Sequence, residues 1–417
     1  MKFLISGGYG YGNVGDEAQL GGIINEIHTN FRSTDITVIS PNPEYTSNQH
    51  ACDKSILASR ESLFFQSRFP PLYNVRSKRE GGLLLKFGNF CLKLMFWARM
   101  IYFLLNVIVF RTFGLTFSNK SISKLIKNIH SCDIFFVSGG GFLTESTLSR
   151  LLDTSMLLIA AKLLGSKCVL SGQTIGKISS RLNRVWFSWA LNGCELISTR
   201  DPEDSINSLK TLMQSYEFKK NVLFTSDDAL FVKPIKVTDH PYKGYVGLQL
   251  HYWGINDFNF VIDYYQKIVT ELHKKNIKKI VLFSMHSSDE DAIKALLKSC
   301  AGLEFFQHDY SYPSVISFVQ QLDFVISMKH HPLIFAAGGC VPAISVNFSD
   351  YYRHKNVGAL KNFGTESLHV NLEIDKFDKM SSLIEDVVLN KKTWVDLIRT
   401  NLKDASRRRN SFWNRLK

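Results

Sequence analysis

Cationic and imidazole side chains follow predicted strands in both halves of the chain. Arg200 comes directly after an apolar strand, and its guanidinium can form paired hydrogen bonds with a carboxylate or a phosphate. Lys329, His330 and His331 follow another apolar strand, where they supply a cation and groups able to transfer protons. This pattern favours a site for an anionic substrate. Plainer interpretations are an ion pair of Arg200 with neighbouring acids and a surface location for the histidines.

Glycine-rich segments follow three further predicted strands, and backbone N–H groups at such turns can bind an anion. Two of them are predicted to open a helix, which would place Glu145 within a first helical turn. A NAD site is disfavoured because no acidic residue ends the second strand. A tight turn with Asp16 capping the next helix is the plainer interpretation. The candidate substrate-binding or loop-forming residues are Gly10, Gly12, Asn13, Gly15, Asp16, Gly139, Gly140, Gly141 and Gln173.

Apolar strands and amphipathic helices alternate along nearly the whole chain, which is typical of parallel sheets covered by helices. The pattern predicts an N-terminal Rossmann-like domain over 1–232 and a linker over 233–243 that contains two prolines. A second Rossmann-like domain over 244–390 and a basic C-terminal helix over 391–417 follow. We therefore expect an α/β protein in which two domains face each other across a cleft, the GT-B-like architecture.

An apolar helical insertion is predicted within the first domain, at about 81–117. Phe90–Phe110 is dominated by apolar residues, yet Lys93 and Arg99 lie inside it and Lys86 and Arg111 flank it. Charges at these positions disfavour a transmembrane span. Two interpretations remain open: a helix at a membrane surface, or a long helix packed on the sheet.

The composition of the 417-residue chain is that of a globular protein, with 45% hydrophobic and 21% charged residues. Its net charge of +13 favours an anionic partner. Seven scattered cysteines disfavour a disulfide framework and a structural zinc site. The first residues predict a strand, not a signal peptide, so we expect a cytoplasmic protein.

Five segments, in order, resemble the polysaccharide pyruvyl transferase family. They are the Gly-Asn-Val-Gly-Asp-Glu opening at 12–17, the Ser-Gly-Gly-Gly loop at 138–141, the Gly-Gln-Thr-Ile-Gly turn at 172–176, Arg200-Asp201 before a helix, and the stretch from Ile326 to Val346. The resemblance spans almost the whole chain. It implies a GT-B-like fold and transfer of the pyruvyl group of phosphoenolpyruvate to two hydroxyls of a sugar, with release of phosphate.

The resemblance also implies roles for individual residues. Arg200, Lys329 and His330 would bind the donor, and His331 and Glu145 would be the catalytic acid and base. Members of the family usually have Arg-Leu-His where this chain has Lys-His-His at 329–331. Lysine keeps the charge but cannot form the paired hydrogen bonds of arginine. No cofactor and no metal are expected, with phosphoenolpyruvate as co-substrate.

The expected partners are phosphoenolpyruvate and a sugar or oligosaccharide acceptor from a cell-envelope or exopolysaccharide precursor. A lipid-linked acceptor would suit the basic, apolar insertion and place the protein peripherally at the inner face of the plasma membrane. No nucleic-acid binding is expected, because the basic residues are not interleaved with aromatic ones. Two alternatives remain: a GT-B-type glycosyltransferase with a nucleotide-sugar donor, and a non-catalytic binding protein of the same fold.

Overall fold

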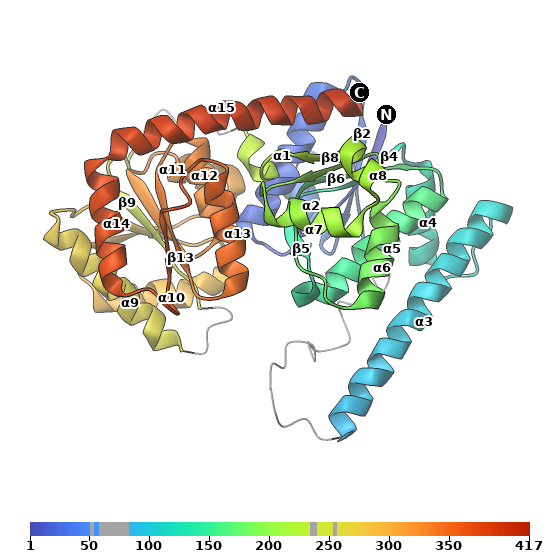
Figure 1. Ribbon diagram of the computed structural model, residues 1–417, viewed down its shortest axis with the longest axis horizontal. Coiled ribbons are helices and arrows are strands. Elements are labelled where there is room, and N and C mark those ends of the chain that lie inside the picture. Colours follow the sequence, from blue (N-terminus) through green and yellow to red (C-terminus); the bar gives the residue numbers. More distant parts are fainter. Residues whose placement is uncertain (51–53, 58–82, 234–239, 253–256) are drawn as a thin grey trace.

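The computed structural model describes residues 1–50, 54–57, 83–233, 240–252 and 257–417. Two α/β units lie side by side, each built on a parallel sheet flanked by helices (Figure 1). The predicted fold class is therefore confirmed. The strands of the two sheets lie on either side of the predicted linker, whose residues 234–239 are outside the described ranges.

The first sheet has the strand order β3-β2-β1-β4-β6-β7-β8, with β5 paired to β6, and every pair is parallel. Its strands are β1 (Lys2–Ser6), β2 (Asp35–Ser40), β3 (Lys54–Leu57), β4 (Ile134–Val137), β5 (Gly140–Leu143), β6 (Lys167–Ile175), β7 (Leu196–Thr199) and β8 (Val222–Phe224). Its helices are α1 (Val14–Asn30), α2 (Pro43–Gln49), α3 (Leu83–Phe113), α4 (Lys120–Ser131), α5 (Leu148–Leu163), α6 (Arg181–Leu191), α7 (Asp204–Leu212) and α8 (Ser215–Asn221).

The second sheet has the order β11-β10-β9-β12-β13-β14 and is also parallel. Its strands are β9 (Val246–Gln249), β10 (Ile280–Phe283), β11 (Leu303–Phe306), β12 (Phe324–Ser327), β13 (Ala343–Asn347) and β14 (His369–Asn371). Its helices are α9 (Phe258–Lys274), α10 (Glu290–Ser299), α11 (Tyr312–Val319), α12 (His330–Gly338), α13 (Asp350–Lys361) and α14 (Phe377–Leu389).

Both sheets reverse their strand order beside the first strand of the unit, between β1 and β4 and between β9 and β12. Ligands of open α/β sheets bind at such switch points, beyond the carboxyl ends of the strands. The helix after β1 is positioned by one apolar face, since Leu20, Ile23 and Ile27 of α1 are fully buried. This packing fixes the start of α1, and with it the glycine loop before it.

One local prediction is wrong. The glycine triplet after β4 does not open a helix: it runs into the short strand β5, and α5 begins only at Leu148. Glu145 therefore lies in a 3-10 turn, η2 (Glu145–Thr147), before the helix. Helix α12 begins at His330, with Lys329 as its N-cap, so both histidines belong to its first turn. The pairing of β5 with β6, a tertiary contact, overrides the helical pattern.

The C-terminal helix α15 (Lys391–Leu416) joins the two units. It runs along one side of the molecule from the second unit to the first (Figure 1). Its last turns are anchored by Phe412 and Trp413, which are buried in the core around β1 and α1. Arg409 of the same helix is also buried and pairs with Glu26 and Asp228 of the first unit. Contacts at the far end of the chain thus hold the two sheets together.

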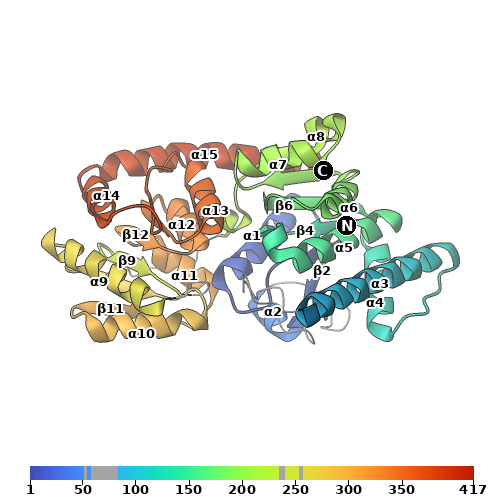
Figure 2. The ribbon, with the colours of Figure 1, turned by 60° about the horizontal axis from the view of Figure 1, so that its bottom comes forward.

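Helix α3 lies within the segment predicted as an apolar insertion, and it is at the outer edge of the first unit, away from the second (Figures 1 and 2). Met100, Phe103 and Val107 form its inner stripe and are buried in the core of the first unit. Within the described residues no helix, α3 included, has the length and apolarity needed to cross a bilayer.

Candidate functional site

The two units meet at the loop before α1 and the first turn of α12. The backbone N–H of Val14 donates to the carbonyl of Met285, at 3.0 Å, across the junction. Gly15 lies directly against His331: a Cβ built on this glycine would be 1.8 Å from Nδ1 of the imidazole. Only glycine allows this approach. The structure therefore brings together two predicted site residues that are 316 positions apart in the sequence.

Asp227, just after β8, is the centre of the polar contacts at this junction. Its carboxylate accepts hydrogen bonds from Nη1 of Arg200 at 2.7 Å and from Gln19 at 3.1 Å. Nε2 of His330, from the second unit, lies 3.2 Å from the same carboxylate. Burial alone would raise the pKa of Asp227, but His330 and the charge of Arg200 hold that pKa well below its usual value. Asp227 is therefore ionised and orients both groups.

Three buried nitrogen atoms around Asp227 have no hydrogen-bond partner within the described residues. They are Nη2 of Arg200, Nδ1 of His330 and Nε2 of His331. Buried polar groups are normally satisfied, because an unmade hydrogen bond costs about 1–3 kcal/mol. Unpartnered donors and acceptors beside a ligand-binding edge are the groups that a bound substrate would satisfy.

Both histidines are neutral at physiological pH. Burial, reinforced by the charge of Arg200, lowers the pKa of His330 to about 3. Burial also lowers the pKa of His331 well below its usual value, although the carboxylate of Asp227 opposes this shift. A neutral imidazole can accept a proton. His331 therefore has the protonation state of a general base before substrate arrives.

Asp16 of α1 and Lys355 of α13 add an acid and a cation from opposite sides of the junction. Burial raises the pKa of Asp16 to about 6, and the charge of Lys355 opposes this rise. Burial and the charge of Arg200 lower the pKa of Lys355 to about 8. Both groups therefore titrate near neutral pH. We call Asp16, Arg200, Asp227, His330, His331 and Lys355 the interdomain cluster.

Lys329 is engaged elsewhere. Its ammonium lies 2.7 Å from both carboxylate oxygens of Asp289, within the second unit. Its backbone N–H donates to the side chain of Gln249 at the end of β9. The predicted role of Lys329 in donor binding stays a prediction. The lysine that belongs to the interdomain cluster is Lys355.

The candidate glycines form a framework beneath the cluster. Asp228 accepts from the N–H of Gly139 at 2.6 Å and from the hydroxyl of Ser171, while Arg409 lies 3.0 Å away. The amide of Gln173 donates to the carbonyl of Ser138 at 2.7 Å, which holds the strand ends of β4 and β6 together. These contacts give Gly139 and Gln173 a structural part in the loop, and substrate binding by Gly139, Gly140, Gly141 and Gln173 stays a prediction.

The loop before α1 is held in a similar way. Asn13 caps α1 by accepting from the N–H of Gly15 at 3.0 Å. Gly10 and Gly12 have positive φ angles of 88° and 75°, which favour glycine. The N–H of Gly10 donates to the buried carboxylate of Glu17, which also pairs with His50. The helix cap is thus Asn13, and not Asp16 as the plainer interpretation had it.

Glu145 caps a different helix. Its carboxylate accepts from the backbone N–H groups of Ser179 and Ser180, at 2.9 and 2.8 Å, and from the amide of Asn183. These groups surround the start of α6. Burial opposes them, but together they lower the pKa of Glu145. A carboxylate held by three donors is a poor proton acceptor, and the catalytic role of Glu145 stays a prediction.

No metal ligand set accompanies these residues. Within the described ranges, no three His, Cys, Asp or Glu side chains lie where they could hold a metal ion. Independence from metals and cofactors stays a prediction.

Several solved structures of known proteins share the fold. UDP-N-acetylglucosamine 2-epimerase from Neisseria meningitidis, bound to UDP-GlcNAc, aligns with a TM-score of 0.54 and 12% identity over 95% of this chain and 94% of its own. The corresponding epimerase from Methanocaldococcus jannaschii gives 0.52 and 11%, covering 92% of each chain. A spinosyn rhamnosyltransferase gives 0.50 and 10% over 97% and 96%. At such identities the likeness shows the fold alone, that of the GT-B enzymes.

The sequence identifies the family, which the fold alone does not. It matches the polysaccharide pyruvyl transferase family over residues 13–350, most of the chain. The protein belongs to this family, which is a family of transferases. No curated protein sequence matches the chain.

Two residues of the interdomain cluster are not found by reading the sequence. Asp227 carried a usable signal, because it follows a predicted strand and lies beside a second acid, Asp228. Lys355 carried none: it lies inside α13, past the last residue of the family match, and no motif surrounds it. Only the packing of α13 against α12 brings its charge to the junction.

Proposed function

We propose that the protein transfers the pyruvyl group of phosphoenolpyruvate to a sugar of a cell-envelope or exopolysaccharide precursor, forming a pyruvate ketal and releasing phosphate. The observation that carries this proposal is the set of buried, unpartnered nitrogen atoms of Arg200, His330 and His331 at the junction of the two units. It lies in a chain of the pyruvyl transferase family.

The donor needs cationic partners because it carries both a carboxylate and a phosphate. Nη2 of Arg200 is available for one of them, since its other nitrogens contact Asp227 and Thr174. Lys355 supplies a second cation near Arg200 and Asp16. A bound dianion would raise the pKa of Lys355 and hold it in its charged form.

Ketal formation makes three bonds to the donor carbons and breaks two, the C2=C3 π bond and the C2–O bond to phosphate. C3 gains a proton and becomes a methyl group, while one sugar hydroxyl adds to C2. The second hydroxyl then forms its bond to C2 as the C2–O bond to phosphate breaks. Of the two hydroxyl protons, the equivalent of one ends on C3 and the other leaves with the phosphate, so the reaction balances without an oxidant or a further reactant.

Two members of the interdomain cluster suit these proton transfers. His331 is neutral and has a free nitrogen, so it is proposed to accept the proton of a sugar hydroxyl. Asp16, with a pKa of about 6, is proposed to protonate C3 and to replace Glu145 in the role of second acid–base group. Asp227 acts as a positioning residue, because it orients Arg200 and His330 without needing to touch the substrate.

The acceptor is proposed to be a sugar or oligosaccharide. This proposal rests on the family and gains support from fold neighbours whose names include UDP-GlcNAc 2-epimerase and rhamnosyltransferase. A lipid-linked form of the acceptor stays a prediction from the sequence, as does a peripheral location at the plasma membrane.

Thermal unfolding with added ligands tests the donor. We expect phosphoenolpyruvate to raise the melting temperature, since a ligand at a hundredfold excess over Kd adds about 2.7 kcal/mol of stability. Lys355→Met should weaken this effect about ten- to hundredfold in apparent Kd, as expected for losing hydrogen bonds to a charged group. Lys361→Met is the matched control, because Lys361 lies on the same helix but pairs with the exposed Glu203.

Pyruvate, phosphate, a panel of nucleotide sugars and an anionic polysaccharide complete the experiment. Stabilisation by a nucleotide sugar but not by phosphoenolpyruvate would replace the proposal with glycosyl transfer. Stabilisation by anionic polysaccharide alone, with no turnover of phosphoenolpyruvate, would indicate a non-catalytic binding protein.

A further inference from the structure

Helix α3 has a second apolar stripe that faces away from the protein. Ile101, Leu105 and Ile108 follow one another at intervals of four and three residues, so they lie on one face of the helix. Their side chains are 57%, 48% and 49% exposed. Phe113, at the end of the helix, is 70% exposed. Large apolar side chains gathered on one surface mark an interaction site.

The neighbouring helix α6 continues this surface. Its exposed residues Leu182, Val185 and Trp189 also recur at helical spacing. Trp186 connects the two helices: its ring lies 5.6 Å from Trp97 of α3 and 5.6 Å from Trp189. The apolar surface thus spans two helices joined by a row of three indoles.

The charged side chains of α3 and α6 themselves have one sign, and the acid beside them is Glu145 of η2, at the start of α6. No Asp or Glu occurs between residues 81 and 132, a stretch that contains seven Lys and Arg residues. None occurs between 177 and 194 either, where Lys177, Arg181 and Arg184 lie. Within the described residues, neither Arg181 nor Arg184 has an ion-pair partner, and both are exposed. This basic apolar surface would repel a cationic partner and attract an anionic one.

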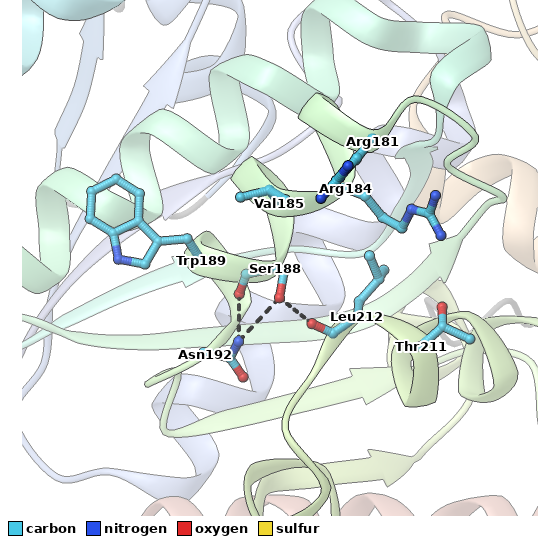
Figure 3. Close-up of a pocket in the computed structure, with 8 residues that line it drawn as sticks. All are labelled: Arg181, Arg184, Val185, Ser188, Trp189, Asn192, Thr211 and Leu212. Carbon is cyan, nitrogen blue, oxygen red and sulfur yellow. Dashed lines mark hydrogen bonds between the residues drawn. The ribbon is translucent and has the colours of Figure 1, made fainter.

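Beside the surface, α6 and the end of α7 form a shallow, open hollow of about 370 Å³. Figure 3 shows the guanidinium of Arg184 reaching toward Leu212 and Thr211 of α7, and Trp189 of α6 also lines the hollow. Two arginines at a hollow can bind a phosphate, and a tryptophan next to them suits the boundary between headgroups and acyl chains.

We propose that the α3–α6 surface docks on an anionic lipid bilayer. The exposed side chains of Ile101, Leu105 and Ile108 would enter the acyl boundary, and Arg181 and Arg184 would bind lipid phosphates at the hollow on α6. The protein lies on the membrane and does not span it. This surface is separate from the interdomain cluster, so the proposal is independent of the reaction proposed above.

Flotation of the full-length protein with lipid vesicles tests the proposal. We expect binding to vesicles that contain phosphatidylglycerol, little binding to pure phosphatidylcholine, and release by high salt. Arg181→Gln with Arg184→Gln should reduce the partition coefficient about thirtyfold, at about fivefold for each charge near an anionic surface. Arg399→Gln with Arg407→Gln is the matched control, since it removes two exposed charges from α15.

A second pair of variants tests the apolar part. Ile101→Ser with Leu105→Ser should weaken binding by about tenfold or more, whereas Ile374→Ser with Leu389→Ser, which alters two even more exposed side chains of the second unit, should not. Equal flotation of the wild type with both kinds of vesicle would overturn the proposal. So would a wild type that does not float but forms a dimer that these α3 substitutions dissociate. Stabilisation by phosphoenolpyruvate should be the same in every variant.

Discussion

Asp227 and Asp228 are neighbours in the sequence but belong to two different clusters of charged side chains. The clusters differ in whether every guanidinium nitrogen of their arginine has a partner. Asp228 belongs to the anchor of α15, where each guanidinium nitrogen of Arg409 has a partner: Nε and Nη2 contact Glu26, and Nη1 contacts Ser171 and Asp228. Asp227 belongs to the interdomain cluster, where Nη2 of Arg200 has no partner within the described residues.

This difference separates a structural cluster from a functional one. In the anchor every guanidinium nitrogen of Arg409 has a partner within the protein, so this arginine fixes α15 against the first unit. In the interdomain cluster, Arg200, His330 and His331 each have one nitrogen without a hydrogen-bond partner within the described residues. A buried nitrogen without a hydrogen-bond partner lowers stability when the site is empty, and a polar ligand that supplies the partner restores that stability.

The largest expected effect concerns the anchor. Arg409→Met leaves the buried Asp228 and the half-buried Glu26 without their cation, so we expect the free energy of unfolding to fall by about 3–5 kcal/mol. Urea unfolding measures this change. Arg407→Met, on the exposed side of the same helix, should change stability by less than about 0.5 kcal/mol. Similar losses in both variants would contradict the assignment of an anchor.

Gly15→Ala should damage the interdomain cluster through sterics alone. The new methyl group would lie 1.8 Å from His331, so the units must separate or the imidazole must move. We expect a loss of about 1–3 kcal/mol in stability and about a hundredfold fall in kcat/KM. Gly8→Ala is the control in the same loop, since its methyl would meet other atoms only at 3.7 Å or more. Full activity in Gly15→Ala would exclude His331 from catalysis.

Substitution of Glu145 tests whether a carboxylate held by three hydrogen bonds within the protein is structural and not catalytic. Glu145→Gln should cost about 1 kcal/mol, the usual value of a helix cap, and leave kcat nearly unchanged. Ser180→Ala, which removes the N-cap of the same helix, should have an effect of similar size. A fall in kcat of more than about a hundredfold would restore Glu145 to the catalytic role that the sequence predicted.

Asp16 should show the opposite behaviour, with an effect on stability that depends on pH. Its pKa of about 6 in the folded protein exceeds the usual 3.8, so ionisation above pH 6 disfavours the folded state. Asp16→Asn should therefore be more stable than the wild type at pH 7–8, and the advantage should fade as pH falls from about 6 to 4.

Urea unfolding of both proteins across this range measures the difference. Asp263→Asn, which removes one carboxylate from an exposed position of α9, is the control for the loss of a negative charge. Loss of activity in Asp16→Asn together with its higher stability would mark Asp16 as a functional residue. A difference that is constant with pH would contradict the raised pKa.

Much of this protein follows from local sequence patterns. The alternation of apolar strands with amphipathic helices predicted two parallel sheets, and the motifs at the strand ends predicted Gly15, Arg200 and His331, which the structure brings to one junction. Such patterns suffice because strand and helix periods, and glycine turns, are properties of neighbouring residues.

The rest depended on contacts between distant segments. β5 forms because the glycine triplet pairs with β6, and Glu145 becomes a helix cap because η2 packs beside the start of α6. Lys355 reaches the cluster only because α13 packs on α12. Sequence by itself determined the two sheets and which kinds of residues end their strands. Tertiary structure alone decided which carboxylates and cations have partners within the protein and which do not. That depends on which atoms meet when the two units and α15 pack together.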